Sequence, residues 1–121
     1  MNEEVSTAIE TDGSGDATVY LGTRLRGRVH AIKYTPGTIA TGGDLTITGE
    51  TTLVPILVQA NAGTSEVWFY PRAFPNQNTD GAAEADARED IYVFKERIKV
   101  VVAQGGATKT GSITAYIDTP K

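Results

Sequence analysis

Cysteine is absent from this sequence of 121 residues, and histidine and tryptophan each occur once. Without cysteine the chain can form no disulfide, no thiolate metal site and no cysteine nucleophile. A single histidine, His30, cannot build a conventional zinc site, and no Gly-x-Ser-x-Gly motif is present to pair with it. The sequence therefore predicts a protein that is not an enzyme and that holds neither a cofactor nor a metal ion.

Long apolar runs are also lacking. The first ten residues, MNEEVSTAIE, are acidic and do not resemble a signal peptide, and no stretch approaches the length of a transmembrane helix. The net charge of −4 argues against nucleic acid as a partner. We expect a protein that is made in a reducing cytoplasm and binds neither membranes nor nucleic acid.

The chain is instead rich in short segments of alternating apolar and polar residues, separated by glycine and other turn-forming residues. Such spacing is typical of an all-β sandwich or barrel, and the chain length suits one domain. We predict a single-domain β-sandwich over residues 1–121 with about nine short strands. The predicted strands cover residues 4–10, 17–21, 25–34, 44–48, 53–60, 66–70, 91–94, 98–103 and 112–118.

Residues 91–103, IYVFKERIKVVVA, hold the densest group of β-branched and aromatic residues. These residue types favour strands. The charged residues 95–97 interrupt the apolar run, so the pattern predicts a β-hairpin that turns at this point. The segment 81–88 is expected to be irregular, with one or two helical turns at most.

A row of basic residues forms the first candidate site. Alternate residues of a strand project from the same face, and like charges cannot be buried without partners. Two interpretations stay open: a solvated face that pairs with Glu3, Glu4 or Glu10 of the same fold, or a contact with an acidic partner or a neighbouring subunit. The row consists of Arg24, Arg26, Arg28 and His30.

A second candidate site lies around Pro71, where Trp68, Tyr70 and Phe74 flank Arg72. Aromatic residues and arginine are enriched at protein interfaces, and aromatic rings also stack on sugars. The alternative is that these rings form a second apolar face of the sandwich core. The predicted partner-binding residues are therefore Arg24, Arg26, Arg28, His30, Trp68, Tyr70 and Arg72.

Two loops, residues 12–16 and 76–81, carry oxygen-bearing side chains at spacings similar to those of calcium loops. The first has Ala17 and Thr23 where a calcium loop needs glycine and glutamate, and the second has Ala87 in place of the glutamate. We predict that both are turns, because Asp, Asn and Gly favour turns intrinsically.

Six segments carry a family resemblance. In chain order they are ETDGSGDATVYLG, HAIKYTPG, GGDLTITGETT, WFYPRA, ERIKVVVAQGG and TGSITAYID. In this layout, which spans nearly the whole chain, the sequence resembles the small structural proteins in the heads of tailed bacteriophages. The likeness is one of overall layout and includes no catalytic signature.

The resemblance implies a decoration (cement) protein with a jelly-roll-like fold. Such a protein would be a homotrimer that is made in the host cytoplasm and binds the major capsid protein on the outside of the virion. Residues 1–10 would act as a flexible or docking arm. The alternatives are a head–tail connector or head-fibre subunit and, from another class, a carbohydrate-binding module in which Trp68 and Tyr70 stack on sugar.

Overall fold

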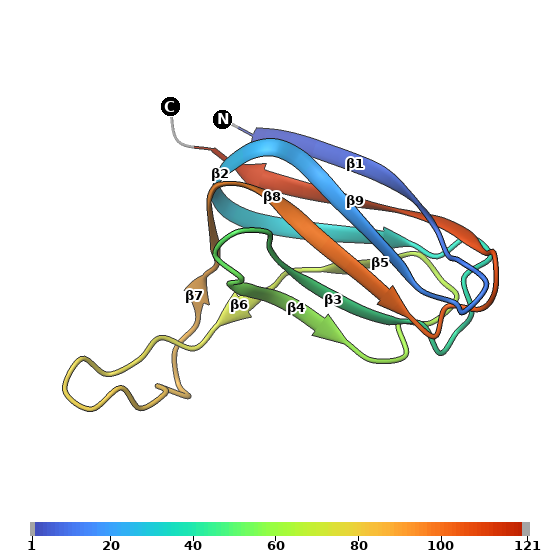
Figure 1. Cartoon of the computed structure of the whole chain (residues 1–121). Coiled ribbons are helices and arrows are strands. Elements are labelled where there is room, and N and C mark those ends of the chain that lie inside the picture. Colours follow the sequence, from blue (N-terminus) through green and yellow to red (C-terminus); the bar gives the residue numbers. More distant parts are fainter. Residues whose placement is uncertain (1, 120–121) are drawn as a thin grey trace.

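The computed structural model describes residues 2–119. These residues form nine strands and no helix, which confirms the predicted β-sandwich class (Figure 1). In the described part of the chain, no helix has the length and apolar character needed to cross a membrane. The strands are β1 (Asn2–Glu10), β2 (Ala17–Thr35), β3 (Asp44–Gly49), β4 (Pro55–Gln59), β5 (Val67–Phe69), β6 (Arg72–Ala73), β7 (Glu89–Asp90), β8 (Tyr92–Ala103) and β9 (Thr110–Asp118).

Seven of the strands form one antiparallel sheet that folds over itself. The order is β1-β9-β2-β8-β3-β4, and β5 pairs with β2 beside this path. Buried residues from β1, β3, β4 and β9 belong to the same hydrophobic cluster, so the two ends of the sheet face each other across one core. The first strand pairs with the last, in a jelly-roll-like winding that places Asn2 opposite Asp118.

Strand β2 connects the two layers. Its first part, to Arg28, pairs with β8, and its second part, from Arg28 onward, pairs with β9. The predicted division into two strands at residues 17–21 and 25–34 is wrong. At Gly22, which has a positive φ of 74°, the chain bends through a register shift and does not turn back.

Strand β8 is also continuous, so the predicted hairpin over residues 91–103 is wrong. Leu25 of β2 pairs with Glu96 and Arg26 pairs with Phe94, which leaves Lys95 as an extra residue in a β-bulge. Lys95 has a positive φ of 56°. Because of this extra residue, Lys95 is exposed and Glu96 points to the buried face of β8, the face that also carries Ile98, Val100 and Val102.

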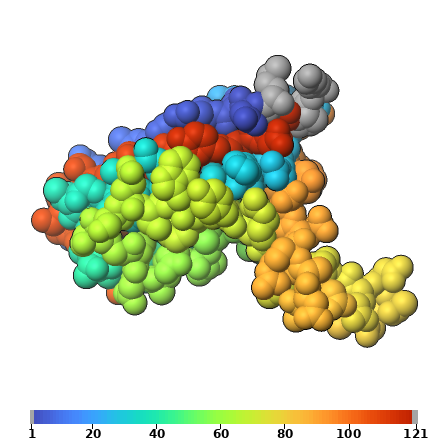
Figure 2. Space-filling model, turned by 180° about the vertical axis from the view of Figure 1, so that it is seen from behind, coloured from blue at the N-terminus to red at the C-terminus, as the bar shows by residue number. Residues whose placement is uncertain are grey.

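Residues 2–10, expected as a flexible or docking arm, form β1, which pairs with β9 along its whole length. The segment 81–88 is irregular, as expected, and contains no helix. It belongs to an extension that we call the projecting hairpin, residues 72–90, formed by β6, β7 and the loop between them. Figure 1 and Figure 2 show that this hairpin leaves one end of the sandwich and points away from it.

Among residues 2–119, the hydroxyl of Tyr34 is a buried side-chain polar atom that lacks a hydrogen-bond partner. Tyr34 is fully buried, and burial also raises the pKa of this phenol. An unsatisfied buried hydroxyl reduces stability.

We therefore expect Tyr34→Phe to raise the free energy of unfolding by about 1 kcal/mol and the thermal midpoint by about 4 °C. Thermal denaturation followed by circular dichroism measures this change. Tyr20→Phe, at a partly exposed tyrosine, is the control and should leave the midpoint unchanged. A lower midpoint for Tyr34→Phe would mean that the hydroxyl is hydrogen-bonded in solution.

Candidate interaction surface

The structure brings most of the predicted site residues together at the base of the projecting hairpin. The Arg72 guanidinium donates to the main-chain carbonyl of His30, over 3.4 Å, and the His30 ring meets the Tyr70 ring edge-on at a centroid distance of 6.3 Å. Arg24 and Arg26 lie farther back along β2 and are exposed. The residues gathered at the base are Arg28, His30, Trp68, Tyr70 and Arg72.

A group of ion pairs connects the hairpin to the sandwich. The Arg28 guanidinium lies 3.1 Å from a carboxylate oxygen of Asp118 and 3.7 Å from one of Asp90, which Arg72 Nε also approaches to 3.3 Å. The prediction that the basic row pairs with β1 glutamates is wrong for Arg28, because its partners come from β7 and β9. Exposed ion pairs contribute little stability individually, but this network connects β6 and β7 of the hairpin to β2 and β9 of the sandwich.

Trp68 of β5 and Tyr70, which directly follows β5, face outward. Trp68 is 43% exposed and Tyr70 is 60% exposed, whereas Val67 and Phe69 pack against the core. The alternative of a second core face is therefore wrong for these two rings. Trp68 stacks on Tyr116 at a centroid distance of 5.2 Å. A small hollow of about 190 Å³ is lined in part by four rings, those of His30, Trp68, Tyr70 and Tyr116.

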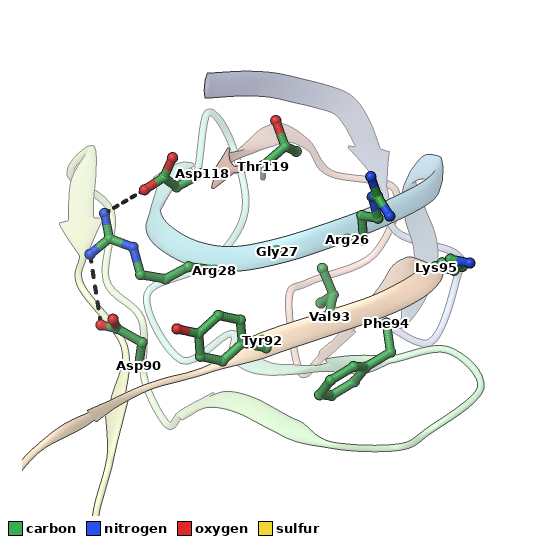
Figure 3. Close-up of a pocket in the computed structure, with 10 residues that line it drawn as sticks. All are labelled: Arg26, Gly27, Arg28, Asp90, Tyr92, Val93, Phe94, Lys95, Asp118 and Thr119. Atoms are coloured by element: carbon green, nitrogen blue, oxygen red, sulfur yellow. Dashed lines mark hydrogen bonds and ion pairs between the residues drawn. The ribbon is translucent and has the colours of Figure 1, made fainter. Parts of the chain in front are cut away.

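A larger hollow of about 640 Å³ is lined mainly by residues of the paired strands β2 and β8. Arg26 is the cross-strand partner of Phe94, and Arg28 is that of Tyr92. Both aromatic rings are about half exposed or more. Figure 3 shows the residues of this hollow. They are Arg26, Gly27, Arg28, Asp90, Tyr92, Val93, Phe94, Lys95, Asp118 and Thr119.

Sequence reasoning missed Tyr92, Phe94 and Lys95 as surface residues. It placed residues 91–94 in a strand without assigning the two faces of that strand, although Tyr92 and Phe94 alternate with the buried Ile91 and Val93. That alternation was the signal that their rings lie on the opposite, exposed face.

The two loops compared with calcium sites are turns. The Asp12 carboxylate accepts hydrogen bonds from the backbone amides of Asp16 and Ser14, and these bonds lower its pKa. In the other loop, the Asp80 carboxylate accepts from the amide of Ala82. Among residues 2–119, no group of three or more histidine, cysteine, aspartate or glutamate side chains could hold a metal ion.

Half-exposed aromatic rings beside arginine are typical of protein–protein interfaces. The surface around the hairpin base is therefore suited to binding another protein. No protein-family model matches the sequence, and no curated protein matches it.

Proposed function

We propose that this chain is a non-enzymatic structural protein of a tailed-bacteriophage head, which binds the outside of the capsid shell and stabilises it. The observation that carries the proposal is the group of exposed aromatic residues around the base of a projecting hairpin. Exposed apolar side chains that gather on one part of a soluble protein often mark a site of interaction. The exposed residues are Trp68, Tyr70, Phe74, Tyr92 and Phe94.

The rest of the molecule suits such a role. A compact sandwich with one core gives a rigid platform, and the hairpin extends its reach beyond the body (Figure 2). A decoration protein needs only modest affinity for each capsid subunit, because an oligomer that binds several subunits gains avidity through effective concentration. In this proposal the protein is a homotrimer, its partner is the major capsid protein, and its location is the virion surface.

The test is addition of the purified protein to phage heads that lack it. We expect hundreds of copies to bind per head, counted by quantitative mass spectrometry, and the temperature at which the heads release DNA to rise. Trp68→Ser/Tyr70→Ser should weaken binding, whereas Val58→Ser, at an exposed apolar residue of β4, should not. A handful of copies at one vertex would favour the connector or fibre alternative, and the absence of binding would refute the proposal.

A carbohydrate-binding role is the second candidate, favoured by the half-exposed Trp68 and the exposed Tyr70 that line one small hollow. Stacking on Tyr116 already occupies one face of the indole, which leaves less of the ring for sugar. A glycan array with Trp68→Ala as the control tests this role. The absence of any signal that depends on Trp68 would remove it.

A further inference from the structure

The outer part of the projecting hairpin, residues 74–88, is acidic. It carries Asp80, Glu84 and Asp86, and its single basic residue is Arg88. The Arg88 guanidinium lies 4.3 Å from the centre of the Phe74 ring and donates hydrogen bonds to two carbonyls of the same segment. None of the three acids forms an ion pair with another residue in the range 2–119, so their charges are available to a partner.

The hairpin is held in shape by its own hydrogen bonds. The amide of Gln77 donates to the carbonyl of Ala82, over 2.8 Å, and the amide of Glu84 donates to that of Pro75, also over 2.8 Å. A segment with a fixed shape loses less conformational entropy on docking than a flexible one. Because it points away from the sandwich (Figure 1, Figure 2), the hairpin presents its acids to another molecule and not to its own body.

A complementary surface lies on the body of the same chain. Arg24, Arg26 and Lys95 are exposed, and within the described residues none of them has an ion-pair partner. Arg26 and Lys95 border the 640 Å³ hollow, whose wall also carries the rings of Tyr92 and Phe94 (Figure 3). Arg28, which also lines the hollow, is already paired with Asp90 and Asp118.

We infer that the acidic hairpin of one copy docks in the basic, aromatic-lined hollow of a second copy. The charges are opposite on the two surfaces: the hairpin carries three acids, the hollow has Arg26 and Lys95 on its wall, and Arg24 lies two residues before Arg26 on β2. Each copy then offers one hairpin and one hollow, which is a head-to-tail contact, and such contacts close into rings when the rotation between copies permits. A trimeric ring is one such closure. This interface does not depend on the proposed binding to a capsid.

The test measures the mass of the purified protein by size-exclusion chromatography with light scattering. We expect an oligomer whose mass falls toward that of a monomer as NaCl rises from about 50 mM to about 500 mM, because salt screens exposed charges. Reversal of either surface, by Arg26→Glu/Lys95→Glu or by Glu84→Lys/Asp86→Lys, should raise the dissociation constant at least about 100-fold. The chain that carries all four changes should assemble again.

The control is Glu10→Lys/Lys109→Glu, at exposed positions outside both surfaces, and it should keep the oligomer mass. Circular dichroism of each variant verifies that it is folded. A wild-type monomer at about 100 μM, or a fourfold variant that fails to reassemble, would overturn the inference. If the reversed variants keep their mass but no longer bind phage heads, the two surfaces serve the shell; the inference is then wrong while the proposed function stands.

Discussion

Glu96→Ala is expected to lower the free energy of unfolding by about 3 kcal/mol, because it removes a buried charge that holds four donors. The side chain is only 3% exposed. Its carboxylate accepts hydrogen bonds from the amides of Thr51 and Thr52 at 2.9 Å, from the Thr52 hydroxyl at 2.9 Å and from the amide of Phe94 at 3.2 Å. Urea denaturation of the variant and the wild type measures the loss.

These contacts explain why a charged residue is tolerated inside the sandwich. Two of the amides belong to the turn between β3 and β4 and the third belongs to β8, so the carboxylate joins that turn to the bulge at Lys95. Alanine would leave these donors without an acceptor. Glu3→Ala, at an exposed position of β1, should change the free energy of unfolding by less than about 0.5 kcal/mol.

The carboxylate of Glu96 also makes the stability of the protein depend on pH. Burial raises the pKa of Glu96, but donation from Thr52, Thr51 and Phe94 lowers it by more, so the pKa in the folded protein is below its ordinary value of 4.5. A lowered carboxyl pKa contributes stability that is complete above pH 4.5 and is lost as the pH falls through the folded-state pKa.

Glu96→Gln tests whether the charge of the carboxylate provides this stability, since the amide keeps the shape of the side chain but does not titrate. We expect the variant to lose less stability than Glu96→Ala at pH 7, and its difference from the wild type to shrink below pH 4.5. A difference that stays constant down to acid denaturation would show that the carboxylate charge is not what stabilises the turn.

Gly27→Ala is expected to cost a comparable amount, about 3 kcal/mol or more. Gly27 has a φ of 122°, which side-chain-bearing residues rarely adopt, and a Cβ atom there would lie 2.4 Å from the carbonyl oxygen of Asp118. The methyl group would therefore force β9 away from β2 at the point where β2 passes from one layer to the other.

The matched control is Gly13→Ala, because the space around Gly13 is open and its φ is not positive. We expect this change to be within about 0.5 kcal/mol of the wild type. Thermal and urea denaturation of both variants provide the comparison. Equal stabilities for the two variants would mean that β2 and β9 do not approach each other as closely as the structure has them.

The alternation of apolar and polar residues was enough to place most strands. Residues 44–48 and 112–118 were predicted within two residues of β3 and β9. The failures occurred where a strand continues through an irregularity. Gly22 and the charged residues 95–97 have the chemistry of turn residues, and only the partner strand decides between a turn and a bulge.

The candidate site was predictable in composition but not in arrangement. The alternation along β2 correctly suggested that its basic residues project from one face, since Arg24, Arg26 and His30 are exposed. The partners of Arg28 lie 62 and 90 residues away along the chain (90 − 28 and 118 − 28). Such pairings follow from strand order, which periodicity alone does not contain.

The pairing of Asn2 with Asp118 also has a mechanical consequence. Tension applied between Asn2 and Asp118 would load the hydrogen bonds between β1 and β9 one pair after another, because these bonds run across antiparallel strands. The domain should therefore yield to low forces in that direction. Tension along β2 would have to shear its bonds to strands of both layers at once, so the molecule should resist it far more strongly.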